Sequence, residues 1–156
     1  METDKLFYRW GKVKDGTPAS AIVHIEVLPN ASNTNGFIEL YCGKGFYSQG
    51  SLEEVPEFGY DSWRIAARKG LEYAFSLTQT CWTVKIFKIQ GRVFTDTNPT
   101  IVGYTVIRTF CDQAKIILQE NTITELEQFV FSSWKSPYKE LIPDFFNLTF
   151  SDFTNC

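Results

Sequence analysis

The sequence predicts an α+β fold with an antiparallel or mixed β-sheet of about four strands, two helices packed on one face of the sheet, and a C-terminal helix with an aromatic tail. Its 156 residues, 44% of them hydrophobic and 16% aromatic, are enough for one core, so we expect a single domain. Apolar and polar residues alternate in stretches within residues 6–42, which is typical of strands. Residues 82–117 then combine a strand, a polar turn and a helix. We place the core in residues 6–117 and the C-terminal helix and tail in residues 122–156.

The N-terminal part predicts a three-stranded antiparallel start. Residues 6–13 and 20–28 alternate in polarity, and Asp15-Gly16 between them favours a hairpin turn because glycine accepts a positive φ. After a polar loop, residues 37–42 predict a third strand beside the second. Residues 43–59 contain repeated glycines and a proline, and they predict a long exposed loop or an edge hairpin.

A helix is predicted over residues 61–77, with Asp61 or Ser62 as its N-cap. Ala66, Gly70 and Ala74 recur at a spacing of four and form a stripe of small residues on this helix. Such a stripe lets another helix or a sheet approach closely, which outweighs the cost of about 1 kcal/mol for an interior glycine.

The clearest strand covers residues 82–89, with a turn expected at Gln90-Gly91 and a further short pairing at residues 93–94. The next helix is expected to begin with Pro99 in its first turn, capped by one of residues 96–98. It is apolar around most of its circumference up to about Ile117, so we expect it between the sheet and neighbouring helices.

The C-terminal third predicts one more helix and a tail. Residues 122–125 fit a capping box that opens a helix to about Ser133. The tail that follows is too apolar to remain in water, so we expect it to pack back on the domain, with docking on a partner as the alternative. Its large side chains are Phe145, Phe146, Leu148, Phe150 and Phe153.

Two consecutive units carry a resemblance to a known family. They are residues 63–74, which hold the small-residue stripe, and residues 83–103, which run from Thr83-Val-Lys-Ile to Gly103. With the order of elements over about residues 20–117, they resemble the fourth domain of elongation factor G. That domain pairs a helix A-x-x-x-G-x-x-x-A with a strand V-x-V/I-x-x-x-x-G. The resemblance implies a fold like ribosomal protein S5 domain 2, and a tip at residues 43–50 and 92–99 that in the family enters the ribosomal decoding region.

Charge and cysteine usage restrict the function classes. The net charge of −3 and the pI of about 5.2 disfavour a broad nucleic-acid footprint and suit a basic partner. The charged N-terminus has no signal-peptide core, and no apolar run approaches the ~18 residues of a membrane span, so we expect a cytoplasmic protein without membrane contact. Cysteines 42, 81, 111 and 156 lie far apart in the sequence, which predicts reduced thiols rather than a zinc or redox centre.

No pattern predicts catalysis, a metal or a cofactor, and we expect a protein that is not an enzyme. His24, the only histidine, shares a strand face with Glu26, but the sequence places no nucleophile beside it, so a structural role is expected and an enzyme using His24 ranks third. Residues 43–45 lack the spacing of a phosphate loop and predict a turn. Residues 96–99 are interpreted as a helix cap rather than an anion site.

The acidic segment of residues 51–60 is the strongest candidate for partner binding. It interleaves carboxylates with large apolar side chains, which suits capture of a basic protein because charge steers the encounter and aromatic residues supply binding energy. The leading hypothesis is therefore a small bacterial immunity or antitoxin-type inhibitor of a basic toxin such as a nuclease. The candidate partner-binding residues are Glu53, Glu54, Glu57, Phe58, Tyr60 and Asp61.

The alternative hypothesis is an RNA- or ribosome-associated factor. It follows from the elongation-factor resemblance and from basic residues that lie near aromatic ones, a combination that holds RNA by phosphate pairing and stacking. The basic residues are Arg64, Arg68 and Lys69 on the first helix and Lys85, Lys88 and Arg92 on the central strand and its turn.

Overall fold

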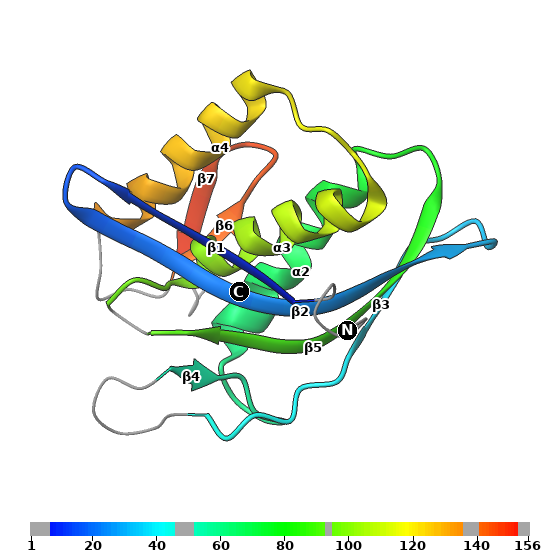
Figure 1. Cartoon of the computed structure of the whole chain (residues 1–156), viewed down its shortest axis with the longest axis horizontal. Helices are drawn as coiled ribbons and strands as arrows, with labels where there is room; N and C mark the ends of the chain where they lie inside the picture. Colours follow the sequence, from blue (N-terminus) through cyan, green and yellow to red (C-terminus); the bar gives the residue numbers. More distant parts are fainter. Residues whose placement is uncertain (1–6, 46–51, 93–94, 136–140, 153–156) are drawn as a thin grey trace.

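The computed structural model describes residues 7–45, 52–92, 95–135 and 141–152 (Figure 1). It confirms a mixed α+β fold, in which a five-stranded mixed sheet carries helices and a separate two-stranded sheet on one side. The strands are β1 (Phe7–Lys14), β2 (Thr17–Asn30), β3 (Gly36–Glu39), β4 (Glu53–Glu54), β5 (Cys81–Gly91), β6 (Leu141–Asp144) and β7 (Thr149–Asp152). The helices are α2 (Asp61–Phe75), α3 (Pro99–Ala114), α4 (Glu120–Ser132) and the short 3-10 helix η1 (Ser133–Lys135).

The predicted N-terminal hairpin is confirmed. β1 and β2 pair antiparallel without a register shift, from Phe7 opposite His24 to Lys14 opposite Thr17. Asp15 and Gly16 both have positive φ values, 52° and 78°. This is the backbone that a two-residue hairpin turn requires, and it explains why Asp-Gly stands there.

The predicted place of the third strand is wrong. β3 does not pair with β2 but runs parallel to β5 at the far side, so that the sheet order is β1-β2-β5-β3. The second edge of β2 is taken by the longer β5, which pairs with it antiparallel from Ile22 opposite Gln90 to Asn30 opposite Cys81. Helix α2 supplies the crossover that parallel pairing of β3 and β5 requires.

β5 also continues through Gln90 and Gly91, where a turn was expected. β4 pairs with this end, Glu53 opposite Gly91 and Glu54 opposite Gln90. A Cβ on residue 91 would lie 2.4 Å from the Thr97 side chain, so glycine is needed here for a close approach rather than for a turn. The expected pairing at residues 93–94 lies outside the described residues.

The segment expected to be a loop or an edge hairpin folds back on itself in its described parts. Gly43 forms a parallel bridge to Pro56, and Gly45 forms an antiparallel bridge to Glu54. β4, which follows, extends this arrangement along the end of β5. The segment is therefore attached to the sheet at both of its described ends.

Helices α2 and α3 approach each other through small residues, as the stripe on α2 predicts. A Cβ on Gly70 would lie 2.4 Å from the carbonyl oxygen of Gly103, and one on Gly103 would lie 2.8 Å from the carbonyl oxygen of Ala66.

The predicted caps of α2 are wrong, because Tyr60 takes the N-cap position in the left-handed conformation and no side chain caps the helix.

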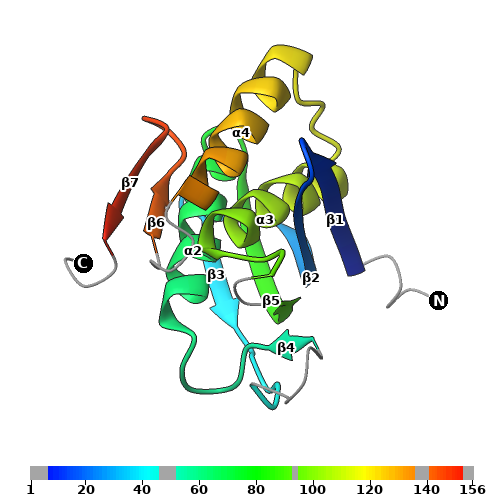
Figure 2. The ribbon, with the colours of Figure 1, turned by 90° about the vertical axis from the view of Figure 1, so that its left-hand side faces the viewer.

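Helix α3 begins as predicted and lies in the centre of the molecule (Figure 2). The Asn98 side chain accepts a hydrogen bond from the Ile101 N–H at 2.9 Å, and Pro99 stands in the first turn. The helix contacts β1 and β2 on one side and α2, α4 and β6 on the others. It ends at Ala114, earlier than expected, because Lys115 adopts a left-handed conformation with a φ of 60°.

The C-terminal tail packs back on the domain, as predicted for its described part. Its strands β6 and β7 form a hairpin, and Phe145 between them is 2% exposed. Phe150 stacks on Phe129 of α4 with ring centroids 4.5 Å apart.

The capping box expected at the start of α4 is wrong, because Glu120 already begins the helix and Ile123 donates its N–H to the Gln119 carbonyl.

The described cysteines are free thiols in different environments. Burial raises the pKa of the Cys111 thiol to about 11, whereas Cys42 is exposed. We expect iodoacetamide near pH 8 to alkylate Cys42 in the native protein and to spare Cys111 until denaturant is added, since the accessible thiolate is the reactive form. Peptide mass spectrometry measures both sites. Equal labelling of the two before unfolding would contradict this expectation.

Candidate functional site

The six candidate partner-binding residues divide into two groups, and the side chains of the first group have partners within the fold. Glu53 is 6% exposed and accepts a hydrogen bond from the Tyr60 hydroxyl at 2.5 Å. Glu54 accepts one from the Gln90 side-chain amide at 2.8 Å. The Tyr60 ring packs edge-on against buried Trp63 with centroids 5.3 Å apart. These contacts fix the segment to β5 and α2, so Glu53, Glu54 and Tyr60 are supporting residues.

The second group is exposed to solvent. Glu57 and Asp61 are exposed, and the side chain of Phe58 is 81% exposed. All three lie on or beside residues 56–60, which connect β4 to α2 and which we call the Phe58 loop. An apolar ring between two carboxylates is therefore the outward feature of this segment.

The guanidinium of Arg64 on α2 binds the backbone of the Phe58 loop. Its Nε donates to the Gly59 carbonyl at 2.7 Å, and its Nη2 donates to the carbonyls of Pro56 and Glu57. The guanidinium also lies over the ring of buried Tyr41, 4.8 Å from the centroid. A charged donor that binds three loop carbonyls, on both sides of Phe58, restrains the backbone around that residue. The basic character of Arg64 in the sequence does not reveal this role, which depends on how the loop folds.

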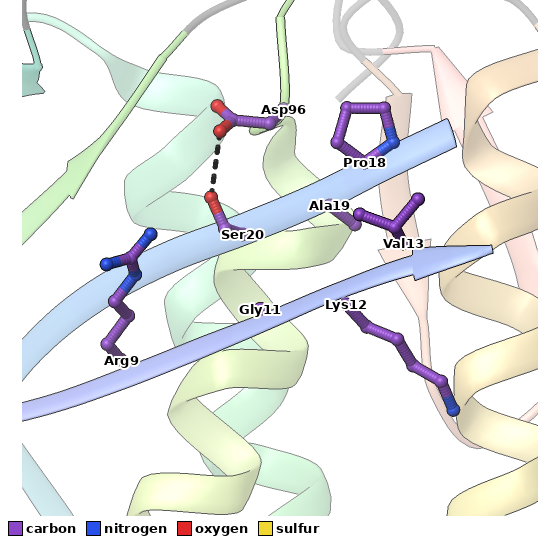
Figure 3. Close-up of a pocket in the computed structure, with 8 residues that line it drawn as sticks. All are labelled: Arg9, Gly11, Lys12, Val13, Pro18, Ala19, Ser20 and Asp96. Atoms are coloured by element: carbon purple, nitrogen blue, oxygen red, sulfur yellow. Dashed lines mark hydrogen bonds between the residues drawn. The ribbon is translucent and has the colours of Figure 1, made fainter. Parts of the chain in front are cut away.

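A groove of about 530 Å³ lies over the hairpin of β1 and β2 (Figure 3). It is hollow because Gly11 has no side chain between Arg9 and Val13. At one border the Ser20 hydroxyl donates to the Asp96 carboxylate at 3.0 Å. His24 lies about 13 Å further along the same face of β2, by the rise of a strand. The structure thus does not bring Ser20, Asp96 and His24 together as a nucleophile, a base and its orienter.

His24 itself lies beside Phe87, with ring centroids 5.0 Å apart. Burial lowers its pKa, Lys88 lowers it further, and Glu26 opposes the shift. The imidazole is therefore neutral at pH 7. Within the described residues, no three His, Cys, Asp or Glu side chains gather in a way that would hold a metal ion.

The basic residues of the alternative hypothesis do not form one patch. On α2, Arg64 binds the loop carbonyls and Arg68 forms a two-point pair with Glu39 of β3, at 3.0 and 2.6 Å. Lys85 on β5 lies 3.8 Å from Glu26. Lys88 and Arg92 belong to the opposite face of the sheet from α2, and Arg9 joins them there. The alternation of β1 around buried Trp10 is the sequence signal that places Arg9 on that face.

No protein-family model matches the chain, and no curated protein matches it. Among the described residues, no helix combines the length and the apolar character needed to span a membrane.

Proposed function

We propose that this chain is a non-catalytic protein-binding module, of the kind represented by small bacterial immunity or antitoxin-type inhibitors, and that its partner is a basic toxin such as a nuclease. The observation that carries the proposal is the Phe58 ring, 81% exposed between two carboxylates on a restrained loop. A folded protein gains no stability from a ring in that position, because burial of apolar surface is what stabilises.

The loop is suited to binding because it is already ordered. Arg64 fixes three of its carbonyls, and Tyr60 and Trp63 pack beneath it. A partner that encloses Phe58 therefore meets little further cost of ordering the loop. Buried aromatic anchors carry much of the energy of protein interfaces, while carboxylates around them speed the encounter with a basic surface.

Replacing Phe58 with alanine tests the anchor. We expect the affinity for the toxin encoded beside this chain to fall by at least about 30-fold, the loss typical of an interface hot spot, while the melting temperature stays unchanged. Calorimetric titration measures the affinity. Phe146→Ala is the matched control, because Phe146 is also a large exposed ring, 57% accessible, on the distant turn between β6 and β7.

Two different results would contradict the interface and the function separately. A toxin complex that forms equally well with Phe58→Ala, or that is weakened by Phe146→Ala instead, would show that the Phe58 loop is not the interface. Failure of the intact chain to bind or inhibit the neighbouring toxin would overturn the functional proposal itself. With Glu57→Lys, the complex should form more slowly at low salt, and the difference should shrink as salt is added.

A further inference from the structure

The sheet has an open face that the helices leave uncovered. Along β2 the side chains of Ala21, Val23 and Ile25 are buried, so the alternate residues between and beyond them point to the other side. Helices α2, α3 and α4 all lie on the buried side (Figures 1 and 2). Figure 3 looks onto the opposite side at the β1–β2 hairpin, with the helices behind the strands. We call that side the open face.

Three cations of the open face lie on neighbouring strands. Arg9 on β1 lies opposite Ile22, which in turn lies opposite Gln90 of β5. Lys88 lies two residues before Gln90 in the chain and Arg92 two residues after it. The rise of a strand puts them about 13 Å apart. Arg9 and Arg92 border one small hollow of about 100 Å³ together with Gln90 and the acidic residue Asp96.

Three carboxylates also lie on this face, and only Glu26 is paired with a cation. Glu26 pairs with Lys85, Glu54 accepts the Gln90 amide, and Asp96 accepts the Ser20 hydroxyl. Arg9, Lys88 and Arg92, by contrast, form no ion pair with any described residue. Among these groups of the open face, the four cations Arg9, Lys85, Lys88 and Arg92 exceed the three carboxylates by one positive charge, although the whole chain has a net charge of −3.

Flat rings lie next to these cations. Phe87 is the extra residue of a β-bulge in β5, at the register shift between His24 and Ile25. Its half-buried ring contacts the His24 ring at 5.0 Å, beside Lys88. On β3, Ile38 is 46% exposed and continues the apolar surface of the open face next to Lys85.

We propose that the open face binds single-stranded nucleic acid, with Arg9, Lys88 and Arg92 pairing with phosphates and the Phe87 ring stacking on a base. An acidic protein would satisfy the cations equally but gains nothing particular from the ring, whereas every base has a flat face to stack. A sheet offers room for splayed bases, which a duplex does not present. This surface shares no residue with the Phe58 loop, and the proposal does not depend on the toxin partner.

The test measures binding of the intact chain to a fluorescein-labelled 12-nucleotide single-stranded RNA by fluorescence anisotropy between 50 and 200 mM salt. Three phosphate contacts give a slope of log K against log salt of about −2, since each contact on a single strand contributes about −0.7. Arg9→Gln and Lys88→Gln should each remove about 0.7 from that slope. Phe87→Leu should weaken binding by about 5- to 150-fold and leave the slope unchanged, because stacking is lost and charge is not.

Lys69→Gln and Lys115→Gln are the matched controls, because both lysines are exposed cations away from the open face. Equal effects of the control and open-face variants would show binding by diffuse charge and would overturn the proposal. The absence of RNA binding at 50 mM salt would also overturn it. If polyglutamate displaces the RNA and Phe87→Leu has no effect, the occupant of the open face is an acidic protein and the proposal is wrong. Melting curves of each variant show that a loss of binding is not a loss of folding.

Discussion

Alanine in place of Gly70 is expected to lower the free energy of unfolding by at least about 2 kcal/mol, the usual cost of overpacking a close contact. The added Cβ would lie 2.4 Å from the Gly103 carbonyl oxygen. That oxygen belongs to the backbone of α3, so the clash is relieved only if the two helices move apart. The gain of about 1 kcal/mol that alanine brings inside a helix is too small to offset it.

Urea unfolding followed by tryptophan fluorescence measures the change. Gly11→Ala is the matched control, because a Cβ on Gly11 meets nothing closer than the Ser20 Cβ at 3.5 Å, an ordinary contact. Its free energy of unfolding should stay within about 0.5 kcal/mol of the starting protein. A Gly70→Ala variant as stable as Gly11→Ala would contradict the close approach of α2 and α3.

Phe145→Ala is expected to cost about 3–5 kcal/mol, the range for removing a buried phenylalanine. The ring is 2% exposed and packs against Phe129 at 5.7 Å, against Tyr73 at 6.3 Å, and over Gly103. Its removal would leave a cavity where α2, α3 and α4 meet the C-terminal hairpin, and the surroundings of such a cavity relax only in part.

The neighbouring phenylalanine provides the control. Phe146 is 57% exposed and packs edge-on against the Tyr73 ring, so Phe146→Ala should cost less than about 1 kcal/mol. Thermal and urea unfolding of both variants compare the two sites directly. Similar stabilities for Phe145→Ala and Phe146→Ala would mean that the tail does not rest on the domain and is free to dock on a partner.

The two proposed surfaces can be separated by mutation. Phe58 lies on the loop before α2, whereas Lys88 lies on the open face of β5. Phe58→Ala should therefore leave RNA binding intact, and Lys88→Gln should leave the toxin complex intact. Loss of both activities in either variant would mean that the surfaces act as one.

Local signals in the sequence determined much of the architecture. The period of two defined β1, β2 and β5, Asp15-Gly16 defined the hairpin, and Pro99 marked the start of α3. The small-residue stripe containing Gly70 predicted a close helix contact. These features depend on residues a few positions apart, whose backbone preferences act before any distant contact forms.

Only the tertiary structure decided which distant segments meet. It placed β3 beside β5 rather than β2, and it made Gly103 the partner of Gly70. It also divided the acidic segment, where Glu53 is enclosed by the fold while Phe58 is presented outward on carbonyls held by Arg64. All segments compete for the same core and the same strand edges. This competition decides which distant strands pair and which side chains are buried, so a local sequence pattern does not predict it.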